Sequence, residues 1–125
     1  MTDIERDELV RRLDDGTLTV LDVRNEDEFT GALGAHCDPR QGRIAGARHL
    51  DLQELMELTA PEIEERLGLP AGAEVVAYCH SGSRSALAVQ ILRAAGYDAR
   101  NYAGSWHEWS RDDSLPFETG RPGGN

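Results

Sequence analysis

The chain has 125 residues, a formal net charge of −10 and an isoelectric point near 4.7, a size that fits one domain with one core. The acidic balance argues against a nucleic acid or an anionic membrane as the main partner, so an anionic substrate must be held by local positive charge. No stretch approaches the length of a transmembrane helix, and the acidic N-terminus lacks a signal-peptide pattern. The chain has two cysteines, too few for a disulfide framework, and we therefore expect a cytoplasmic protein that uses thiol chemistry.

The first half of the chain carries the start and stop signals of short elements. Thr2 and Glu5 form a capping-box pattern that predicts a helix to about Leu13, with Ile4, Val10 and Leu13 facing inward. Beyond it, the sequence predicts a buried strand, an acidic helical turn, a long loop and a brief strand, at 19–23, 25–29, 30–42 and 47–50. Because a loop of that length is unusual in a compact domain, it is a candidate functional segment.

The second half of the chain alternates helices and strands. Thr59 and Glu62, with Pro61 in the first turn, begin a helix that Gly68 ends. The other predicted elements are a short helix, a buried strand, a long helix, a strand and a helical turn, at 52–58, 74–78, 85–95, 99–102 and 106–111. This alternation predicts an α/β fold, with an open parallel sheet covered by helices on both faces. We expect a single domain over residues 1–120 and a loose tail at 121–125.

Cys79 lies where a buried strand ends and the long helix begins. The residues between them form a small polar loop with the sequence Cys-His-Ser-Gly-Ser-Arg. At a helix N-terminus several N–H groups lack helical partners and the dipole end is positive, so a thiol held there ionises more easily and becomes a nucleophile. The alternative is a buried, inert cysteine, which the combination of strand, loop and helix disfavours.

A loop of this shape can stabilise an anion bound to the sulfur, which fits two reactions. Attack on phosphorus would give a phosphocysteine, and attack on sulfane sulfur would give a cysteine persulfide. Four residues separate Cys79 from Arg84, whereas cysteine phosphatases place one more residue between the two. The tighter ring suits one added sulfur atom better than a tetrahedral phosphoryl group.

Six segments, in the same order along the chain, carry a resemblance to a known family. They are 20–29 with its Asp-x-Arg signature, 42–47, the cysteine loop at 79–84, 92–97, 102–109 and 115–120. Together they resemble the rhodanese superfamily, specifically a small single-domain sulfurtransferase, over about residues 18–120. In the second segment Arg43 and Ala45 stand where the family has His and Pro.

The resemblance implies a sulfurtransferase that works through a Cys79 persulfide. It would move sulfane sulfur from an anionic donor, such as thiosulfate, a mercapto-acid or a persulfide, to cyanide or a thiol, a protein thiol included. It implies no cofactor and no metal, and two cysteines with scattered histidines do not match a zinc pattern. The competing hypotheses are a non-catalytic rhodanese-like module that binds a partner or relays sulfur and, less consistent with the loop length, a cysteine phosphatase or arsenate-handling enzyme.

The expected donor site surrounds Cys79. The residues expected to bind the anion are His80, Ser81, Gly82, Ser83 and Arg84, together with Arg40 and Arg43. Asp22 and Arg24, at the carboxyl end of the first strand, are expected to support the loop as an ion pair. In two-domain relatives an arginine stands where Glu28 stands here and helps to hold the substrate. Glu28 therefore disfavours thiosulfate as an efficient donor, and Arg40 or Arg43 is expected to supply the missing charge. Cys37 is expected to be a bystander.

Overall fold

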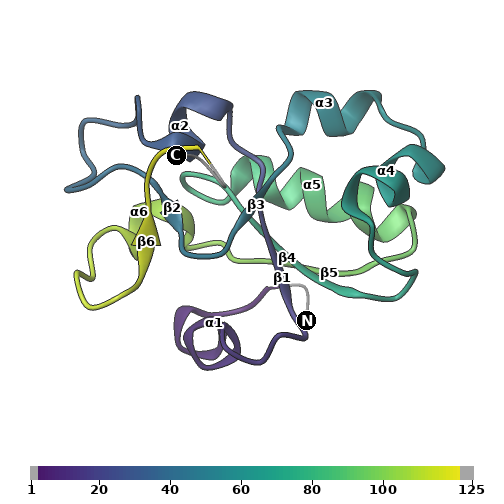
Figure 1. The fold of residues 1–125 in the computed structure, drawn as a ribbon, viewed down its shortest axis with the longest axis horizontal. Helices are drawn as coiled ribbons and strands as arrows, with labels where there is room; N and C mark the ends of the chain where they lie inside the picture. The colour runs from purple at the N-terminus through teal and green to yellow at the C-terminus, as the bar shows by residue number, and fades with distance from the viewer. Residues whose placement is uncertain (1–2, 122–125) are drawn as a thin grey trace.

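A computed structural model describes residues 3–121. Its centre is a four-stranded sheet in the order β3-β1-β4-β5, in which all neighbouring strands are parallel. The strands are β1 (Thr19–Asp22), β3 (Arg48–His49), β4 (Glu74–Tyr78) and β5 (Asp98–Asn101). The predicted open parallel sheet is therefore confirmed (Figure 1). Of the predicted tail, Arg121 is exposed, and 122–125 lie outside the described residues.

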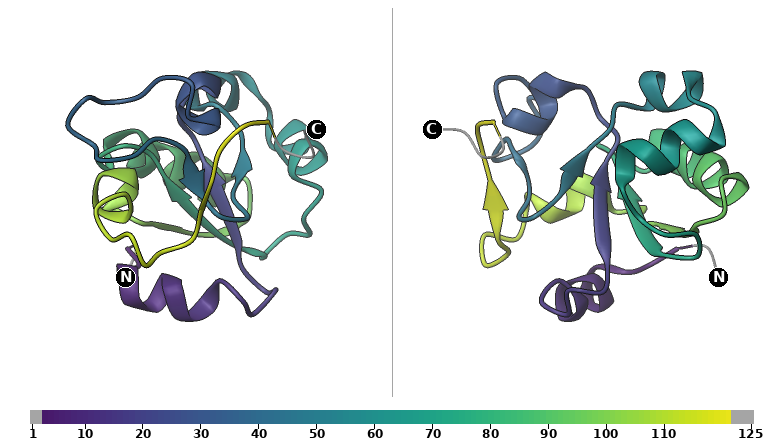
Figure 2. Two further views of the ribbon diagram at one scale, coloured as in Figure 1. Left: turned by 60° about the vertical axis from the view of Figure 1, so that its left-hand side comes forward. Right: turned by 45° about the vertical axis from the view of Figure 1, so that its right-hand side comes forward.

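Helices cover both faces of this sheet, as predicted. One face packs against α3 (Leu52–Glu57), α4 (Ala60–Leu67) and α5 (Ser83–Ala94). The other face is covered by α1 (Arg6–Arg12), α2 (Glu26–Thr30) and α6 (Ser105–Trp109). Figure 1 and Figure 2 show α1 on the opposite side of the strands from α3 and α4. Within the described part of the chain, each helix is too short or too polar to cross a membrane.

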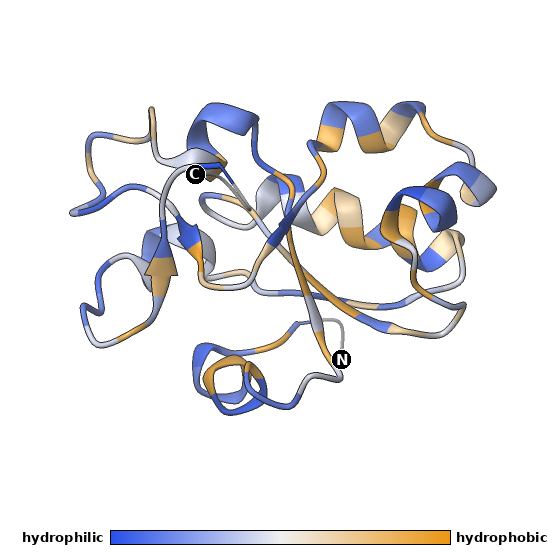
Figure 3. Ribbon diagram, in the orientation of Figure 1, coloured by the Kyte–Doolittle hydropathy of each residue, from blue (hydrophilic) through white to orange (hydrophobic). Residues whose placement is uncertain are grey.

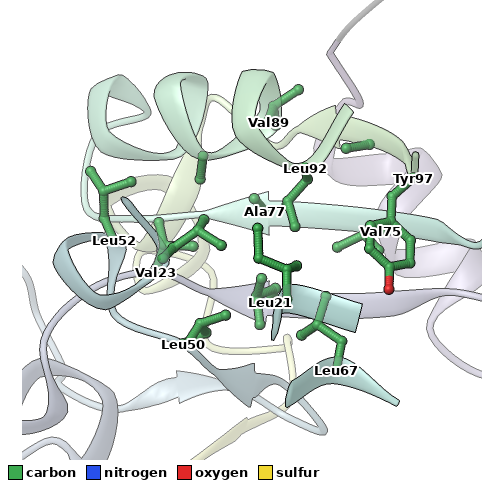
Figure 4. Close-up of a cluster of buried hydrophobic side chains, with 14 of the residues drawn as sticks. Leu21, Val23, Leu50, Leu52, Leu67, Val75, Ala77, Val89, Leu92 and Tyr97 are labelled. Carbon is green, nitrogen blue, oxygen red and sulfur yellow. The ribbon is translucent and has the colours of Figure 1, made fainter. Parts of the chain in front are cut away.

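The alternation of side chains along the strands builds two separate cores. In β4, Val75 and Ala77 point into the core beneath α3, α4 and α5, whereas Val76 and Tyr78 point into the core beneath α1 and α6. Figure 4 shows the first of these cores, with Leu92 of α5 above Ala77. Burial on both faces explains the apolar runs of the two central strands, β1 and β4, which include orange segments in Figure 3.

The helix signals of the second half are confirmed. The Thr59 hydroxyl accepts from the N–H of Glu62, and the Glu62 carboxylate accepts from the N–H of Thr59, which closes the predicted capping box of α4. Gly68 ends α4 in the left-handed conformation, with φ +66°. Local hydrogen bonds between neighbours in sequence therefore determine both ends of this helix.

The first helix is shorter than predicted. It begins at Arg6, and Glu5 makes no side-chain cap, while Thr2, the other half of the predicted capping box, lies outside the described residues. Ile4 is buried but extended, and its N–H donates to the carbonyl oxygen of Asn101 at 3.0 Å. The open edge of β5 binds this segment as extended backbone, and that pairing replaces the first helical turn that the sequence predicted.

A second sheet of two antiparallel strands was not predicted. In it, β2 (Arg43–Ile44) pairs with β6 (Phe117–Glu118). Gly42 precedes β2 with φ +137°, and a Cβ at this position would lie 2.5 Å from the carbonyl oxygen of Glu118, so the close approach requires glycine. Strands of two residues are too short to show a periodic pattern in the sequence.

A buried ion pair holds the main sheet against residues 31–42, the connection between α2 and β2. The Asp22 carboxylate accepts from the backbone N–H and the guanidinium of Arg24, with a shortest distance of 2.6 Å, and both side chains are buried. The Tyr78 hydroxyl donates to the same carboxylate at 2.8 Å, and burial raises the pKa of Tyr78 well above its ordinary value, so this donor stays protonated. Arg24 also donates to the carbonyl oxygen of Gly42 at 2.6 Å. The expected pair is thus formed where β1, β4 and the connection meet.

We predict that Asp22→Ala lowers the free energy of unfolding by about 3–5 kcal/mol, because it leaves the Arg24 guanidinium buried without its counter-charge. Urea denaturation followed by circular dichroism measures the change. The control is Glu54→Ala, which breaks an exposed ion pair with Arg66 and should cost at most about 1 kcal/mol. Equal losses in the two variants would contradict the structural role of the Asp22–Arg24 pair.

Candidate active site

Cys79 follows directly after β4, at the carboxyl edge of the parallel sheet, where α/β folds bind ligands. The loop behind it is compact because Gly82 adopts φ +97°. A Cβ on Gly82 would lie 2.6 Å from the carbonyl oxygen of Ala103, so a larger residue would push the loop away from the chain that follows β5. The strand, loop and helix occur as predicted, with α5 beginning at Ser83 instead of Ser85.

The sulfur of Cys79 is surrounded by hydrogen-bond donors. The N–H groups of Gly82 and Ser85 donate to Sγ at 3.1 and 3.4 Å, and the Ser85 hydroxyl donates at 3.4 Å. The cysteine itself is 0% exposed. The arrangement therefore presents backbone and hydroxyl dipoles to an anionic sulfur that has little access to water.

Ser105, at the start of α6, fixes the backbone of the nucleophile. Its hydroxyl accepts from the N–H of Cys79 at 3.1 Å and donates to the carbonyl oxygen of Tyr102 at 2.8 Å. The backbone N–H of the next residue, Trp106, donates to the carbonyl oxygen of Cys79 at 2.9 Å. Ser105 holds φ +55°, an unfavourable conformation for a serine. Backbone strain of this kind is typical of functional sites.

The hydrogen bonds determine the direction of the pKa shift at Cys79. Burial by itself raises the pKa of the thiol, but donors from Ser85, Gly82 and Ser81 stabilise the thiolate more strongly. The pKa of Cys79 therefore lies below the ordinary value of a cysteine. The thiolate, which is the nucleophilic form, is more populated than it would be for a free cysteine.

Arg84, the last residue of the cysteine loop, is held by Glu28. The guanidinium donates to the two carboxylate oxygens at 2.9 and 3.1 Å. These hydrogen bonds raise the pKa of Arg84. Burial by itself raises the pKa of the Glu28 carboxyl group, but the contact with Arg84 lowers it more strongly. The pKa of Glu28 therefore lies below its usual value. Glu28 thus neutralises the charge of the arginine of the loop.

The remaining loop residues differ in exposure. Ser81 and Ser83 are exposed. His80 is partly exposed, and its Nε2 lies 3.0 Å from Oδ2 of Asp38. The His80 ring therefore faces the connection 31–42, and the backbone of the loop lines the sulfur.

Arg40 of the connection 31–42 and Arg43 of β2 occupy different environments. The Arg40 guanidinium lies over the ring of Phe117, 5.3 Å from its centroid, and is partly exposed. The Arg43 guanidinium is buried over the ring of Phe29 and donates to the carbonyl oxygens of Phe29 and Gly120. Arg43 thus connects α2 to the C-terminal segment, and Arg40 is the one of the two that keeps an accessible charge.

Sequence reasoning missed the two serines that contact the cysteine. Ser85 had a usable signal, because it lies in the first turn of the helix, where side chains reach an anion bound at the N-terminus. No sequence signal pointed to Ser105, because it lies 26 positions from Cys79 along the chain and the two residues meet only in the folded protein.

The chain is similar to known proteins over most of its length. The profile of the Rhodanese-like domain family matches residues 5–112. A thiosulfate sulfurtransferase of Azotobacter vinelandii is 33% identical over 90% of this chain and 44% of that protein. A putative mitochondrial thiosulfate sulfurtransferase of Schizosaccharomyces pombe is 36% identical over 103 residues, covering 77% of this chain and 66% of that protein.

Solved structures show the same similarity. The crystal structure of a probable thiosulfate sulfurtransferase is 44% identical, with a TM-score of 0.81 over 94% of this chain and 47% of that chain. This chain therefore spans about half the length of several proteins that it matches. It belongs to the rhodanese-like domain family.

We predict that Ser85→Ala raises the pKa of Cys79, because the variant removes a donor that stabilises the thiolate. Ultraviolet thiolate absorbance measured against pH reports this pKa, in a Cys37→Ser background that leaves a single thiol. Ser83→Ala, an exposed substitution in the same turn, should leave the titration unchanged. A pKa in Ser85→Ala equal to that of the Ser83 control would refute the role of this hydroxyl.

Proposed function

We propose that this chain is a sulfurtransferase that carries a sulfane sulfur atom on Cys79. The observation that carries the proposal is the set of N–H and O–H donors around Sγ. A persulfide has its negative charge on the added outer sulfur, and donors at a helix N-terminus suit a compact anion bound to the cysteine. The names of the relatives, which are thiosulfate sulfurtransferases, support the class of reaction.

The proposed cycle has two half-reactions. The Cys79 thiolate attacks the outer sulfur of thiosulfate or of a persulfide; a Cys79 S–S bond forms, the S–S bond of the donor breaks, and its electron pair leaves with the released sulfite or thiolate. With a mercapto-acid whose sulfur-bearing carbon lies next to a carbonyl group, the C–S bond breaks instead, and the enolate that leaves takes up the proton of the mercapto group. An acceptor thiolate or cyanide then attacks the outer sulfur and restores the Cys79 thiolate. With a sulfite or thiolate leaving group, neither step needs a general base, a metal or a cofactor.

The same geometry favours sulfur over phosphorus as the atom that Cys79 attacks. A phosphocysteine would need a charged group to hold the oxygens of the phosphoryl group, and Arg84 is the arginine nearest to that role in sequence. Its guanidinium is already bound by both oxygens of Glu28. We therefore assign the short loop to one sulfur atom and not to a phosphoryl group.

The charged groups around Cys79 influence which sulfur donors bind well. Glu28 cancels the charge of Arg84, and Arg43 is buried elsewhere. Arg40 remains as the partly exposed cation that we assign to the donor anion. A dianionic donor such as thiosulfate gains less here than at a site with an arginine at position 28, so we propose persulfides or mercapto-acids as the better donors.

The partners that we propose are small sulfur donors and thiol acceptors, with a protein thiol among the acceptors. Both cysteines are free in the structure. Free thiols persist in reducing compartments, and we place the reaction in the cytoplasm on that ground.

We predict that Cys79→Ser abolishes sulfur transfer from thiosulfate or a small persulfide to cyanide, measured as thiocyanate. Cys37→Ser, which changes the exposed second thiol, should retain most of the activity, because that thiol lacks the donors that surround Cys79. Equal loss in the two variants would mean that the cysteines act as a pair and would refute the assignment of a single carrier.

We also predict that Glu28→Gln lowers the KM for thiosulfate by about fivefold, the equivalent of about 1 kcal/mol for a partly exposed charge. Arg40→Gln should raise the same KM, and both effects should shrink as salt is added. The matched control is Glu26→Gln, an exposed residue of the same helix. If the KM is the same in all three variants, the charge at position 28 does not select the donor.

A further inference from the structure

Four side chains with metal-ligating atoms meet beside the cysteine loop. They are Cys37 and Asp38 from the connection 31–42, His80 from the cysteine loop and His107 from α6. One ligand atom from each lies within 4.8 Å of the others. The three segments that hold these residues are far apart in sequence, so their spacing gave no zinc pattern, and the fold brings them together.

Asp38 lies at the centre of this cluster, and its side chain is 0% exposed. Its Oδ1 accepts from Nη1 of Arg111 at 2.9 Å and lies 3.3 Å from Nδ1 of His107. Its Oδ2 lies 3.0 Å from Nε2 of His80, yet neither of these two buried atoms forms a hydrogen bond with any residue that the structure describes. Buried polar atoms without partners are costly. A cation shared by the two atoms would remove that cost.

The ligand set selects the type of cation. A thiolate, two imidazoles and a carboxylate match a four-coordinate Zn²⁺ site, whereas Ca²⁺ and Mg²⁺ prefer oxygen ligands throughout. The charges of the Cys37 thiolate and the Asp38 carboxylate balance a divalent ion. Arg111 holds Oδ1 of Asp38 and also donates to the carbonyl oxygen of Cys37 at 2.6 Å. It is therefore placed to orient both anionic ligands from outside the coordination sphere.

We propose that Cys37, Asp38, His80 and His107 form a tetrahedral Zn²⁺ site that joins the connection 31–42 to the cysteine loop and α6. The neighbouring backbone already links these segments, because the His107 N–H donates to the carbonyl oxygen of His80 at 2.9 Å. Trp106 Nε1 likewise donates to the carbonyl oxygen of Arg40 at 3.0 Å. Cys79 is not a ligand, so binding of the ion leaves the nucleophile free and does not depend on the proposed sulfur transfer.

The test uses the full chain, freed of metal with a chelator, and adds Co²⁺ or Zn²⁺ alone. One equivalent of Co²⁺ should give a thiolate-to-cobalt charge-transfer band in the near ultraviolet and intense visible bands of tetrahedral cobalt, and Zn²⁺ should displace it. Competition with a chromophoric chelator should give a Kd for Zn²⁺ below about 1 µM.

The variants separate this site from other ligands. Cys37→Ser should lose the charge-transfer band, and both Cys37→Ser and His107→Ala should weaken Zn²⁺ binding by about 100-fold or more, with circular dichroism showing that each variant is folded. His36→Ala, which changes an exposed histidine beside the cluster, and Cys79→Ser should both keep the band. The proposal is overturned if no tetrahedral cobalt spectrum forms, if Cys37→Ser and His107→Ala bind Zn²⁺ as tightly as the unmodified protein, or if the band disappears with Cys79→Ser and persists with Cys37→Ser.

Discussion

A thiolate at Cys79 cannot rely on water for its stability, because the residue is 0% exposed. Hydrogen bonds from Gly82 and Ser85 take the place of that water. They overcome the effect of burial and hold the pKa of the cysteine below its ordinary value. The need to present these donors explains the local structure: β4 ends immediately before Cys79, Gly82 turns the chain sharply, and α5 begins at Ser83 with its N–H groups near the sulfur.

The surrounding scaffold keeps these donors in place and sets the charge around them. The buried Asp22–Arg24 pair, with the Tyr78 hydroxyl, fixes the ends of β1 and β4 beside the loop. Ser105 accepts from the backbone of Cys79 and adopts a strained conformation to do so. Because Arg84 is committed to Glu28, the loop offers an anion mainly oriented dipoles. Glu28 therefore sets the charge beside the cysteine loop through its ion pair with Arg84.

The features that the sequence predicted correctly are those formed by residues close together along the chain. The ends of α4 and the setting of Cys79 were predicted correctly, because caps, apolar runs and a strand–loop–helix junction are determined by neighbours in the chain. The extended segment at Ile4, the β2–β6 pair and the contact from Ser105 were not predicted. Each of these arises from pairing between segments far apart in sequence, and none leaves a periodic or motif-like signal of its own.

The central claim, that Cys79 carries a sulfane sulfur in this loop, is tested most directly by the mass of the intact protein after incubation with a sulfur donor. Thiosulfate, a mercapto-acid and a small persulfide should be compared, each followed by cyanide. The account predicts that the protein gains the mass of one sulfur atom, that cyanide removes it, and that Cys79→Ser gains none. A protein that gains no sulfur from any of the three donors, or a Cys79→Ser variant that gains the same mass, would contradict the account.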